Sequence, residues 1–394
     1  MTKRFLVLVF IFSFVITQAQ NTYDQTEISI LTIGPGSSLN DAFGHNGIRV
    51  KTPYTDVVYD YGRFPFNDPN FYLNFARGKL LYSQGHSATY PVIAYYKNQN
   101  RRIREQVLNL TTKEKQDIHA FLETNALPQN KDYLYDFFYD NCATKIRDVA
   151  EEITNKNIQF NTPKNLEAYT FRDLIQQNLQ WNSWGSLGID IALGSIIDKQ
   201  ATPYEYMFLP KYIHLFFNNA TIKTTGKNLV KKQQTLYSKK EEKLEQNFFS
   251  SPIFIIGLLG IFVLGITYKD YKKGKRSKWL DVAVFSITGL IGVFILLLWF
   301  ATDHTATANN YNLLWAFALN LFVVNQVLKT QPKNWFIKYI KLLIILLCLL
   351  VFHWVMGVQR FAYALIPLLL ALAVRYTYLV RYFNTVIPAK AGIS

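Results

Sequence analysis

The stretch that decides the architecture is Leu280–Ala301, which reads LDVAVFSITGLIGVFILLLWFA. Asp281 is its one charged side chain, and a run of this length and composition is long enough to cross a bilayer as a helix. The same half of the chain contains four more apolar runs, over 252–268, 313–328, 340–356 and 361–380. Pro367 and Arg375 interrupt the last of them. The sequence therefore predicts an all-α membrane domain of about five helices over 251–380.

The loops between these runs differ in charge, which predicts their orientation. The loop at 269–278 holds six basic residues, the loop at 302–312 holds no lysine or arginine, and the loop at 329–338 is basic again. Because basic loops stay in the cytoplasm, 269–278 and 329–338 are expected inside. The segment before the first run is then outside, and the tail at 381–394 is cytoplasmic.

The N-terminus predicts the same orientation. Lys3 and Arg4 precede an apolar stretch at 5–16, and the small-residue pattern Thr-Gln-Ala follows. This pattern is typical of a signal peptide over 1–19, with an uncleaved anchor as the alternative. We therefore expect a multi-pass protein of the plasma (inner) membrane with an extracytoplasmic N-terminal domain.

The composition limits the partners and the cysteine chemistry. The chain has 394 residues and a formal net charge of +15, but much of this charge lies beside the expected spans, so no nucleic-acid partner is predicted. Residues 20–220 have the composition of a globular domain, and 221–250 are basic and polar, as in a linker or a solvent-facing helix. Cys142 and Cys348 are the two cysteines. Cys348 lies in an apolar run, which excludes a disulfide framework.

The extracytoplasmic segment has a mixed pattern of strands and helices. Strands are expected at Glu27–Ile33, Asp56–Tyr61, Tyr90–Tyr96, Arg102–Leu110, Leu134–Tyr139 and Ile189–Leu193. Helices are expected at Lys113–Asn125, Ala143–Ile153 and, as a short segment, Tyr204–Phe217. Thr111 and Glu114 form a predicted capping box before the first of these helices.

Cys142 is the strongest candidate for chemistry because it begins a predicted helix. The free N–H groups and the positive end of a helix favour a thiolate and stabilise an oxyanion formed when sulfur attacks a carbonyl. A nearby histidine would complete a nucleophile–base pair. His45, which lies between Gly44 and Gly47, is the candidate. A buried inert cysteine and a structural histidine are the alternatives.

The remaining histidines of the domain are weaker candidates. His86 lies in a loop-like segment and is held in reserve, whereas His119 and His214 fall in expected helices and are predicted to be structural. The sequence has no close spacing of histidine, cysteine and carboxylate of the zinc-binding kind, so neither a metal nor a cofactor is expected.

Several segments together resemble the Lnb N-terminal periplasmic domain family. They are FGHNGIRV at 43–50, YDYG at 59–62, GKL at 78–80, FYDNCAT at 138–144, DIALG at 190–194 and MFLP at 207–210. The resemblance covers roughly 28–219, and the multi-span region that follows fits the architecture of that family. It implies an α+β papain-like fold of the permuted NlpC type, in which the histidine precedes the cysteine. The Asn-Cys at a helix start is also similar to lecithin–retinol acyltransferase-like enzymes.

The resemblance assigns roles by position. It implies that Cys142 is the nucleophile, that His45 is the base, and that Asp60 on the next strand orients the imidazole. A simple turn residue is the alternative for Asp60. Arg49 and Arg63 are candidates for binding an anionic group of the substrate, with a solvated strand edge as the alternative.

The resemblance also implies a reaction. Lipoprotein N-acyltransferase-like chemistry moves an acyl chain from the diacylglyceryl group of a lipoprotein to its N-terminal amine through a cysteine thioester. Membrane lipid and lipoprotein are then the expected substrates. A papain-like cell-wall amidase or peptidase is one alternative, and a non-catalytic envelope sensor or assembly protein is another. The sequence assigns no oligomeric state.

Overall fold

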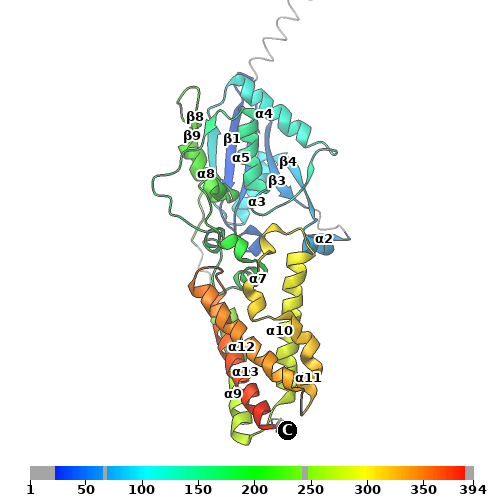
Figure 1. Ribbon diagram of the computed structural model, residues 1–394. Helices are drawn as coiled ribbons and strands as arrows, with labels where there is room; N and C mark the ends of the chain where they lie inside the picture. The colour runs from blue at the N-terminus through cyan, green and yellow to red at the C-terminus, as the bar shows by residue number, and fades with distance from the viewer. Residues whose placement is uncertain (1–22, 65–68, 242–246, 387–394) are drawn as a thin grey trace, which may run out of the picture. The chain divides into compact units, whose positions relative to one another are not determined.

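The computed structural model describes residues 23–64, 69–241 and 247–386 (Figure 1). The expected signal peptide at 1–19 and the last residues of the expected tail lie outside the described residues. The chain divides into two compact units. The first, called here the sheet unit, comprises Met1–Ala168 and Ala201–Glu242; the second, the membrane unit, comprises Tyr169–Gln200 and Lys243–Ser394.

The sheet unit is built on a seven-stranded antiparallel sheet with the order β6-β4-β3-β2-β1-β5-β9. Its strands are β1 (Glu27–Ile33), β2 (His45–Lys51), β3 (Asp56–Arg63), β4 (Leu81–Ala88), β5 (Ile103–Leu108), β6 (Asp132–Leu134) and β9 (Val230–Tyr237). A second sheet pairs β7 (Ile158–Gln159) with β8 (Thr221–Ile222). Together with its helices, this unit confirms the predicted mixture of strands and helices.

Helices cover both faces of the large sheet. The helices of this unit are α2 (Phe71–Arg77), which lies off the end of the sheet (Figure 1), and α3 (Thr89–Asn98), α4 (Thr112–Asn125), α5 (Cys142–Ile153) and α8 (Pro210–Asn219). On one face, Val92 and Tyr96 of α3 pack on Leu31, Ile33 and Val58. Because side chains alternate along a strand, the equally buried Ile28 and Ile30 of β1 point to the opposite face, where α5 contacts β2 and α8 contacts β1.

Three expected strands are wrong, each for a reason of its own. Tyr90–Tyr96 lies in helix α3, because Val92 and Tyr96, four residues apart, form the face that packs on the sheet. Ile189–Leu193 falls largely in α7 (Trp184–Ala192), which the Ser183 side chain caps. Leu134–Tyr139 is mostly a turn, since the Asp136 carboxylate accepts the N–H groups of the next residues.

The expected linker at 221–250 is also wrong, because Val230–Tyr237 is the edge strand β9. Its sequence, VKKQQTLY, has no apolar alternation. Lysine on an edge strand discourages pairing with other chains, which explains why this strand lacks the usual pattern.

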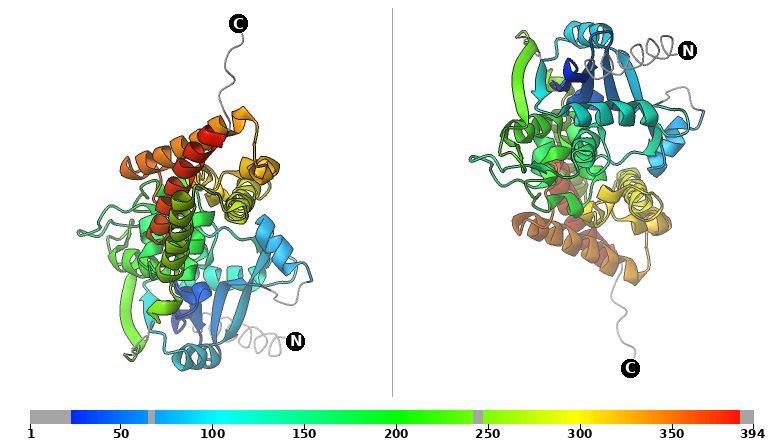
Figure 2. Two further views of the ribbon diagram at one scale, coloured as in Figure 1. Left: turned by 90° about the horizontal axis from the view of Figure 1, so that it is seen from below. Right: turned by 90° about the horizontal axis from the view of Figure 1, so that it is seen from above.

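The membrane unit contains four helices long and apolar enough to span a membrane. They are Pro252–Lys273 (α9), Lys278–Phe300 (α10), Asn334–Val355 (α12) and Tyr363–Val386, the last of which includes α13 (Ile366–Val386). Helix α13 contacts both α9 and α12 (Figures 1 and 2). The run expected at 313–328 is a pair of helical segments, Thr305–Leu314 and Ala318–Leu328, bent by 46°.

The two ends of this bent segment bond to opposite ends of the membrane unit. At one end, Gly194 N–H donates to the Ala306 carbonyl at 2.9 Å, and residue 194 precedes every candidate span of the described chain. At the other end, Arg276 donates to the carbonyls of Val327 (2.9 Å) and Lys329 (3.0 Å). Since Arg276 lies in the loop after the first span, the bent segment crosses the bundle. The membrane unit thus contains four candidate spans, and five when the bent pair is counted as one span.

Arg375, the charge that interrupts the last expected span, is fully buried between two carboxylates. It donates to Asp281 at 2.7 Å and to Asp270 at 2.7 Å, so it joins α13 to α9 and α10. A buried charge of this kind is stable only when it is paired, as it is here.

The boundary between the two units differs from the one expected at 220. Residues 169–200, with α6 (Phe171–Gln176) and α7, group with the membrane helices. Fully buried Arg172 donates to Asp190 and Asp198, and Asp198 in turn accepts the N–H of Arg360 at 3.1 Å. These polar contacts, together with the packing of Leu187 and Ile191 into the apolar core of the spans, attach the segment to the membrane helices.

Candidate active site

Cys142 is the first residue of α5, and a side-chain cap fixes its position. Asn141 Oδ1 accepts the N–H groups of Ala143 at 2.7 Å and Thr144 at 3.0 Å, while Thr144 Oγ1 accepts the N–H of Asn141 at 2.8 Å. No residue in the described part of the chain accepts the N–H of Cys142 itself. That donor remains at the positive end of the helix, next to the sulfur.

His45 begins β2 and faces a carboxylate on the neighbouring strand. Its Nε2–H donates to Asp60 Oδ2 at 3.1 Å, and the two side chains are 20% and 18% exposed. The register that pairs Gly47 with Asp60 gives this geometry. Because Nε2 is engaged, Nδ1 is the ring nitrogen left for Cys142, whose side chain lies near enough to the imidazole to influence its pKa.

The surroundings of His45 favour the imidazolium form. Burial alone would lower its pKa, but the neighbouring Tyr96 and Cys142 side chains and the hydrogen bond to Asp60 outweigh burial and raise the pKa well above 6.5. A protonated imidazole beside the sulfur stabilises a thiolate, which is the nucleophilic form of cysteine.

Gly62 lets β3 pass close to the start of α5. Its φ is +95°, a left-handed conformation that suits glycine, and the β3–β4 register shifts between Asp60 and Arg63. A Cβ placed on Gly62 would lie 3.9 Å from the Cβ of Cys142. This bulge brings the strand that carries Asp60 against the cysteine.

Arg63 holds the second oxygen of Asp60. Its Nε donates to Asp60 Oδ1 at 2.6 Å, and its guanidinium also donates to Ser87 Oγ at 3.1 Å. Burial alone would raise the pKa of Asp60, but His45 and Arg63 together lower it. Asp60 therefore stays a carboxylate and is fixed at both oxygens.

The position of Arg63 depends on a glycine in β4. A Cβ on Gly85 would lie only 2.4–2.5 Å from the Nε, Cδ and Cζ atoms of Arg63. No side chain other than hydrogen leaves room for the guanidinium there. The sheet thus supplies a slot for the arginine that holds Asp60.

Tyrosine rings line the other side of Cys142. Tyr82 and Tyr135 stack with ring centroids 4.2 Å apart, and Tyr133 approaches Tyr61 at 6.1 Å. Burial, followed by the charge of Cys142, raises the pKa of Tyr133 and Tyr135, so both stay protonated. The buried hydroxyl of Tyr133 has no hydrogen-bond partner among the described residues. Aromatic rings therefore form this part of the site, and the Tyr133 hydroxyl is a hydrogen-bond donor that the described residues leave unused.

The other candidates lie apart from this group. His86 is exposed beside the ring of Tyr59, and His119 on α4 contacts Tyr23. Burial lowers the pKa of His214 to about 4. Among the described residues, none of the three forms a hydrogen bond with Cys142 or Asp60, so the reserve role of His86 has no geometric support.

The expectation that Arg49 binds an anionic substrate group is wrong. Its guanidinium is already paired with Asp56 (2.5 Å and 2.7 Å) and with buried Glu105 (2.8 Å). Arg63 is engaged with Asp60. A sequence alone does not reveal such pairs, because their members are up to 56 residues apart.

The three residues predicted for the site are thus brought together, and their catalytic roles stay predictions. The sequence missed Arg63 as a partner of Asp60, although the two are separated by only two residues, and it missed the tyrosines. Among the described residues, no group of three or more His, Cys, Asp and Glu side chains is placed to hold a metal ion. Cys142 and Cys348 are both free.

Comparison with family models covers both parts of the chain. Residues 14–177 match the Lnb N-terminal periplasmic domain, and residues 243–385 match the Lnb transmembrane domain. No curated protein and no solved structure shows significant similarity to the chain. With the same two domains in the same order, the chain belongs to the Lnb family and is a multi-pass membrane protein whose N-terminal domain is extracytoplasmic.

Proposed function

We propose that this protein is a membrane-anchored thiol acyltransferase that acts on lipoproteins. The observation that carries the proposal is the group formed by Cys142, His45 and Asp60 in the extracytoplasmic part of a chain held in the membrane. Thiol chemistry of this kind transfers acyl groups, and membrane attachment suits a substrate that is itself anchored in lipid.

In the first half of the proposed reaction, the Cys142 thiolate attacks the carbonyl of an acyl ester on the diacylglyceryl group of a lipoprotein. The Cys142 N–H lies where it can donate to the oxyanion. When the tetrahedral intermediate collapses, the ester C–O bond breaks, and the imidazolium of His45 gives its proton to the leaving glyceryl oxygen. The products are a Cys142 thioester and a hydroxyl on the glyceryl group.

In the second half, the α-amine of the first lipoprotein residue attacks the thioester. His45, now neutral, takes a proton from the attacking nitrogen, and the sulfur leaves as thiolate. The acyl chain is then amide-linked, and the enzyme has returned to its starting state. Asp60 keeps the His45 tautomer fixed through both halves and does not itself exchange a proton. The tyrosines beside Cys142 limit the access of water, which favours transfer over hydrolysis.

The test is the mass of the N-terminal lipopeptide of an abundant lipoprotein, measured in cells that carry the wild-type, Cys142→Ala or Asp60→Asn gene. Cys142→Ala should abolish the amide-linked acyl chain. Asp60→Asn should slow its formation by about 10²-fold or more, because the imidazole loses its orienting carboxylate. Cys348→Ser changes the other free cysteine and should have no effect. An unchanged lipopeptide in Cys142→Ala cells would refute the proposal and favour an amidase or a non-catalytic envelope protein.

A further inference from the structure

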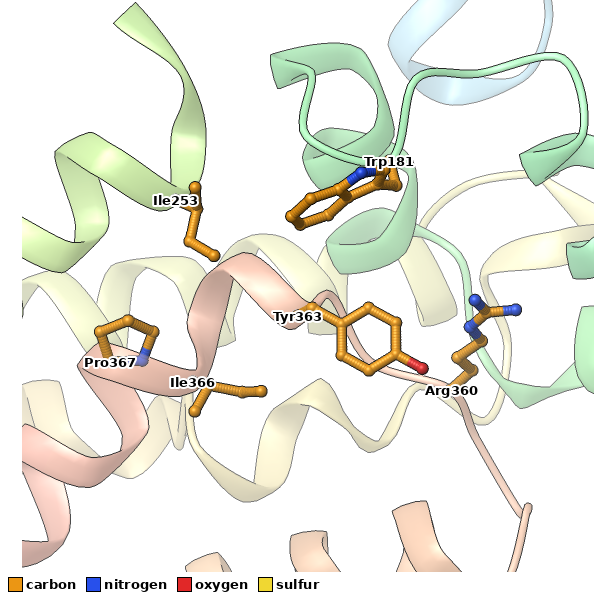
Figure 3. Close-up of a pocket in the computed structure, with 6 residues that line it drawn as sticks. All are labelled: Trp181, Ile253, Arg360, Tyr363, Ile366 and Pro367. Carbon is orange, nitrogen blue, oxygen red and sulfur yellow. The ribbon is translucent and has the colours of Figure 1, made fainter. Parts of the chain in front are cut away.

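The membrane unit contains a cavity of about 580 Å³ at the start of two of its helices. It is lined by Trp181, Ile253, Arg360, Tyr363, Ile366 and Pro367, all of which belong to this one unit (Figure 3). The helices α9 and α13 converge further along. A Cβ on Gly260, two turns into α9, would lie 2.8 Å from the carbonyl oxygen of Pro367. The backbones of α9 and α13 are therefore in close contact at this level.

The cavity lies at the extracytoplasmic end of the spans. Helix α9 is the first candidate span of the described chain and follows the extracytoplasmic domain directly, so its first turn is outside. Residue 360 bonds to Asp198, which precedes that span. The aromatic residues around the cavity fit this depth, because tryptophan and tyrosine concentrate at the head-group level of a bilayer.

The lining is divided into an aliphatic part and an aromatic, cationic part. Ile253, Ile366 and Pro367 form one side, while Trp181 and Tyr363 present their rings, with the Tyr363 hydroxyl directed toward Arg360 (Figure 3). The Arg360 guanidinium carbon lies 5.6 Å from the centre of the Tyr363 ring. This division matches an amphiphile, with a chain on one side and a charged group on the other.

Arg360 has the capacity to bind an anion there. Its Nη1 donates to Asp173 at 2.9 Å, but the side chain is 42% exposed, and a guanidinium carries five N–H donors. Planar, bidentate contact with phosphate is a typical use of the donors that remain. The diacylglyceryl group of a lipoprotein is uncharged at its esters and gives Arg360 no partner, whereas a phospholipid provides both a phosphate and a chain.

We propose that this cavity binds one anionic phospholipid of the extracytoplasmic leaflet. Arg360 contacts the phosphate, Trp181 and Tyr363 lie at the ester level, and one acyl chain lies along Ile253, Ile366 and Pro367. The proposal does not depend on the acyl-transfer reaction, because no residue of the candidate active site takes part in it.

The experiment titrates lipid onto the full-length, delipidated protein in detergent and counts bound lipid by native mass spectrometry. Dioleoyl phosphatidylglycerol should bind with one high-affinity site per chain. Arg360→Gln should weaken this binding about tenfold or more, because a charge-assisted contact is replaced by a neutral one. Ile366→Trp keeps the Arg360–Asp173 pair and fills the aliphatic side, and it should weaken binding as well. Dioleoylglycerol and oleate, which lack the glycerophosphate, should bind more weakly.

Arg381→Gln is the matched control. Arg381 is exposed on α13, and its guanidinium also lies over a tyrosine ring, that of Tyr271 at 5.2 Å, but it does not line the cavity. Its removal should leave phosphatidylglycerol binding unchanged. The proposal is overturned if Arg360→Gln binds phosphatidylglycerol as tightly as the wild type, or if dioleoylglycerol or oleate binds equally well. The lipid result should be the same in Cys142→Ala, so failure of the acyltransferase proposal would leave it standing.

Discussion

At the scale of single residues, the site combines positions that the sequence identifies with positions that it conceals. Cys142 and His45 could be selected because their local settings, a helix start and a glycine-flanked strand start, have chemical meaning on their own. Asp60 came from the family resemblance. The contact of Arg63 with Asp60 and the slot at Gly85 could not be predicted, because a slot for an arginine exists only when two neighbouring strands are in register.

The ionisation of His45 predicts how stability depends on pH. The pKa of His45 is raised in the folded protein. The contribution of His45 to the free energy of unfolding is therefore complete below about pH 6.5, and it is lost as the pH rises through the pKa of the folded state. The wild type should therefore exceed His45→Gln in melting temperature by more at pH 6 than at pH 8.5, measured on the full chain in detergent. The stability contributed by His214 has the opposite pH dependence. Burial lowers its pKa to about 4, so its contribution to stability is lost as the pH falls below about 6.5. A constant difference for His45→Gln across this range would contradict the assignment.

The slot at Gly85 predicts a substitution that acts through another residue. Gly85→Ala should displace the Arg63 guanidinium and free one oxygen of Asp60, which raises the pKa of Asp60 and moves the acid limb of the activity–pH profile upward. The measurement is alkylation of Cys142, or acyl transfer, against pH. In an Arg63→Ala background the same glycine substitution should have little further effect. If the two substitutions act independently, Arg63 is not the link.

At the scale of elements, the cap of α5 is the part that places the nucleophile. The side-chain oxygen of Asn141 accepts two N–H groups of α5. Its side-chain nitrogen donates to the carbonyls of Phe137 at 2.6 Å and Phe208 at 2.8 Å. Asn141 therefore holds the helix start, the turn before it and a distant segment together. It is only 3% exposed, so its removal leaves buried groups without partners.

Asn141→Ala should cost about 2 kcal/mol or more of stability, which is above the usual range for a cap because two buried carbonyls also lose their donor. It should also slow the alkylation of Cys142. Thr111→Ala is the control: Thr111 forms a capping box with Glu114 at the start of α4, and its loss should cost about 1 kcal/mol without affecting Cys142. Equal alkylation rates in the two variants would show that the cap is not needed to place the thiol.

The elements that the sequence predicted well are those whose pattern is local. The capping box of α4 and the apolar face of α5 were expected and are present. Strand β9 and helix α3 were missed because their structure depends on what they pack against. β9 is polar because it lies at an edge, and α3 is rich in tyrosine and β-branched residues although it is helical.

At the scale of the whole molecule, the polar contacts at the two ends of the bent segment favour five crossings over four. Hydropathy alone leaves the bent segment at 305–328 open to two interpretations, a span or a re-entrant loop. If it were re-entrant, the basic residues at 329–338 would lie outside, against the positive-inside rule. The contacts of Arg276 with the carbonyls of Val327 and Lys329 agree with the charges, because they join two basic loops on one side.

This arrangement predicts the labelling of single cysteines in intact cells, in a chain with Cys142→Ser and Cys348→Ser. A membrane-impermeant maleimide should label Thr305→Cys, which is the first residue of the bent segment, and should not label Lys333→Cys, which lies after it. Lysis should make Lys333→Cys accessible, since this position is exposed. Labelling of both positions in intact cells would make the segment re-entrant and place the C-terminal end of α13 outside. The side on which the cavity opens does not depend on this result, because Ile253 in the first turn of α9 lines it and that turn directly follows the extracytoplasmic domain.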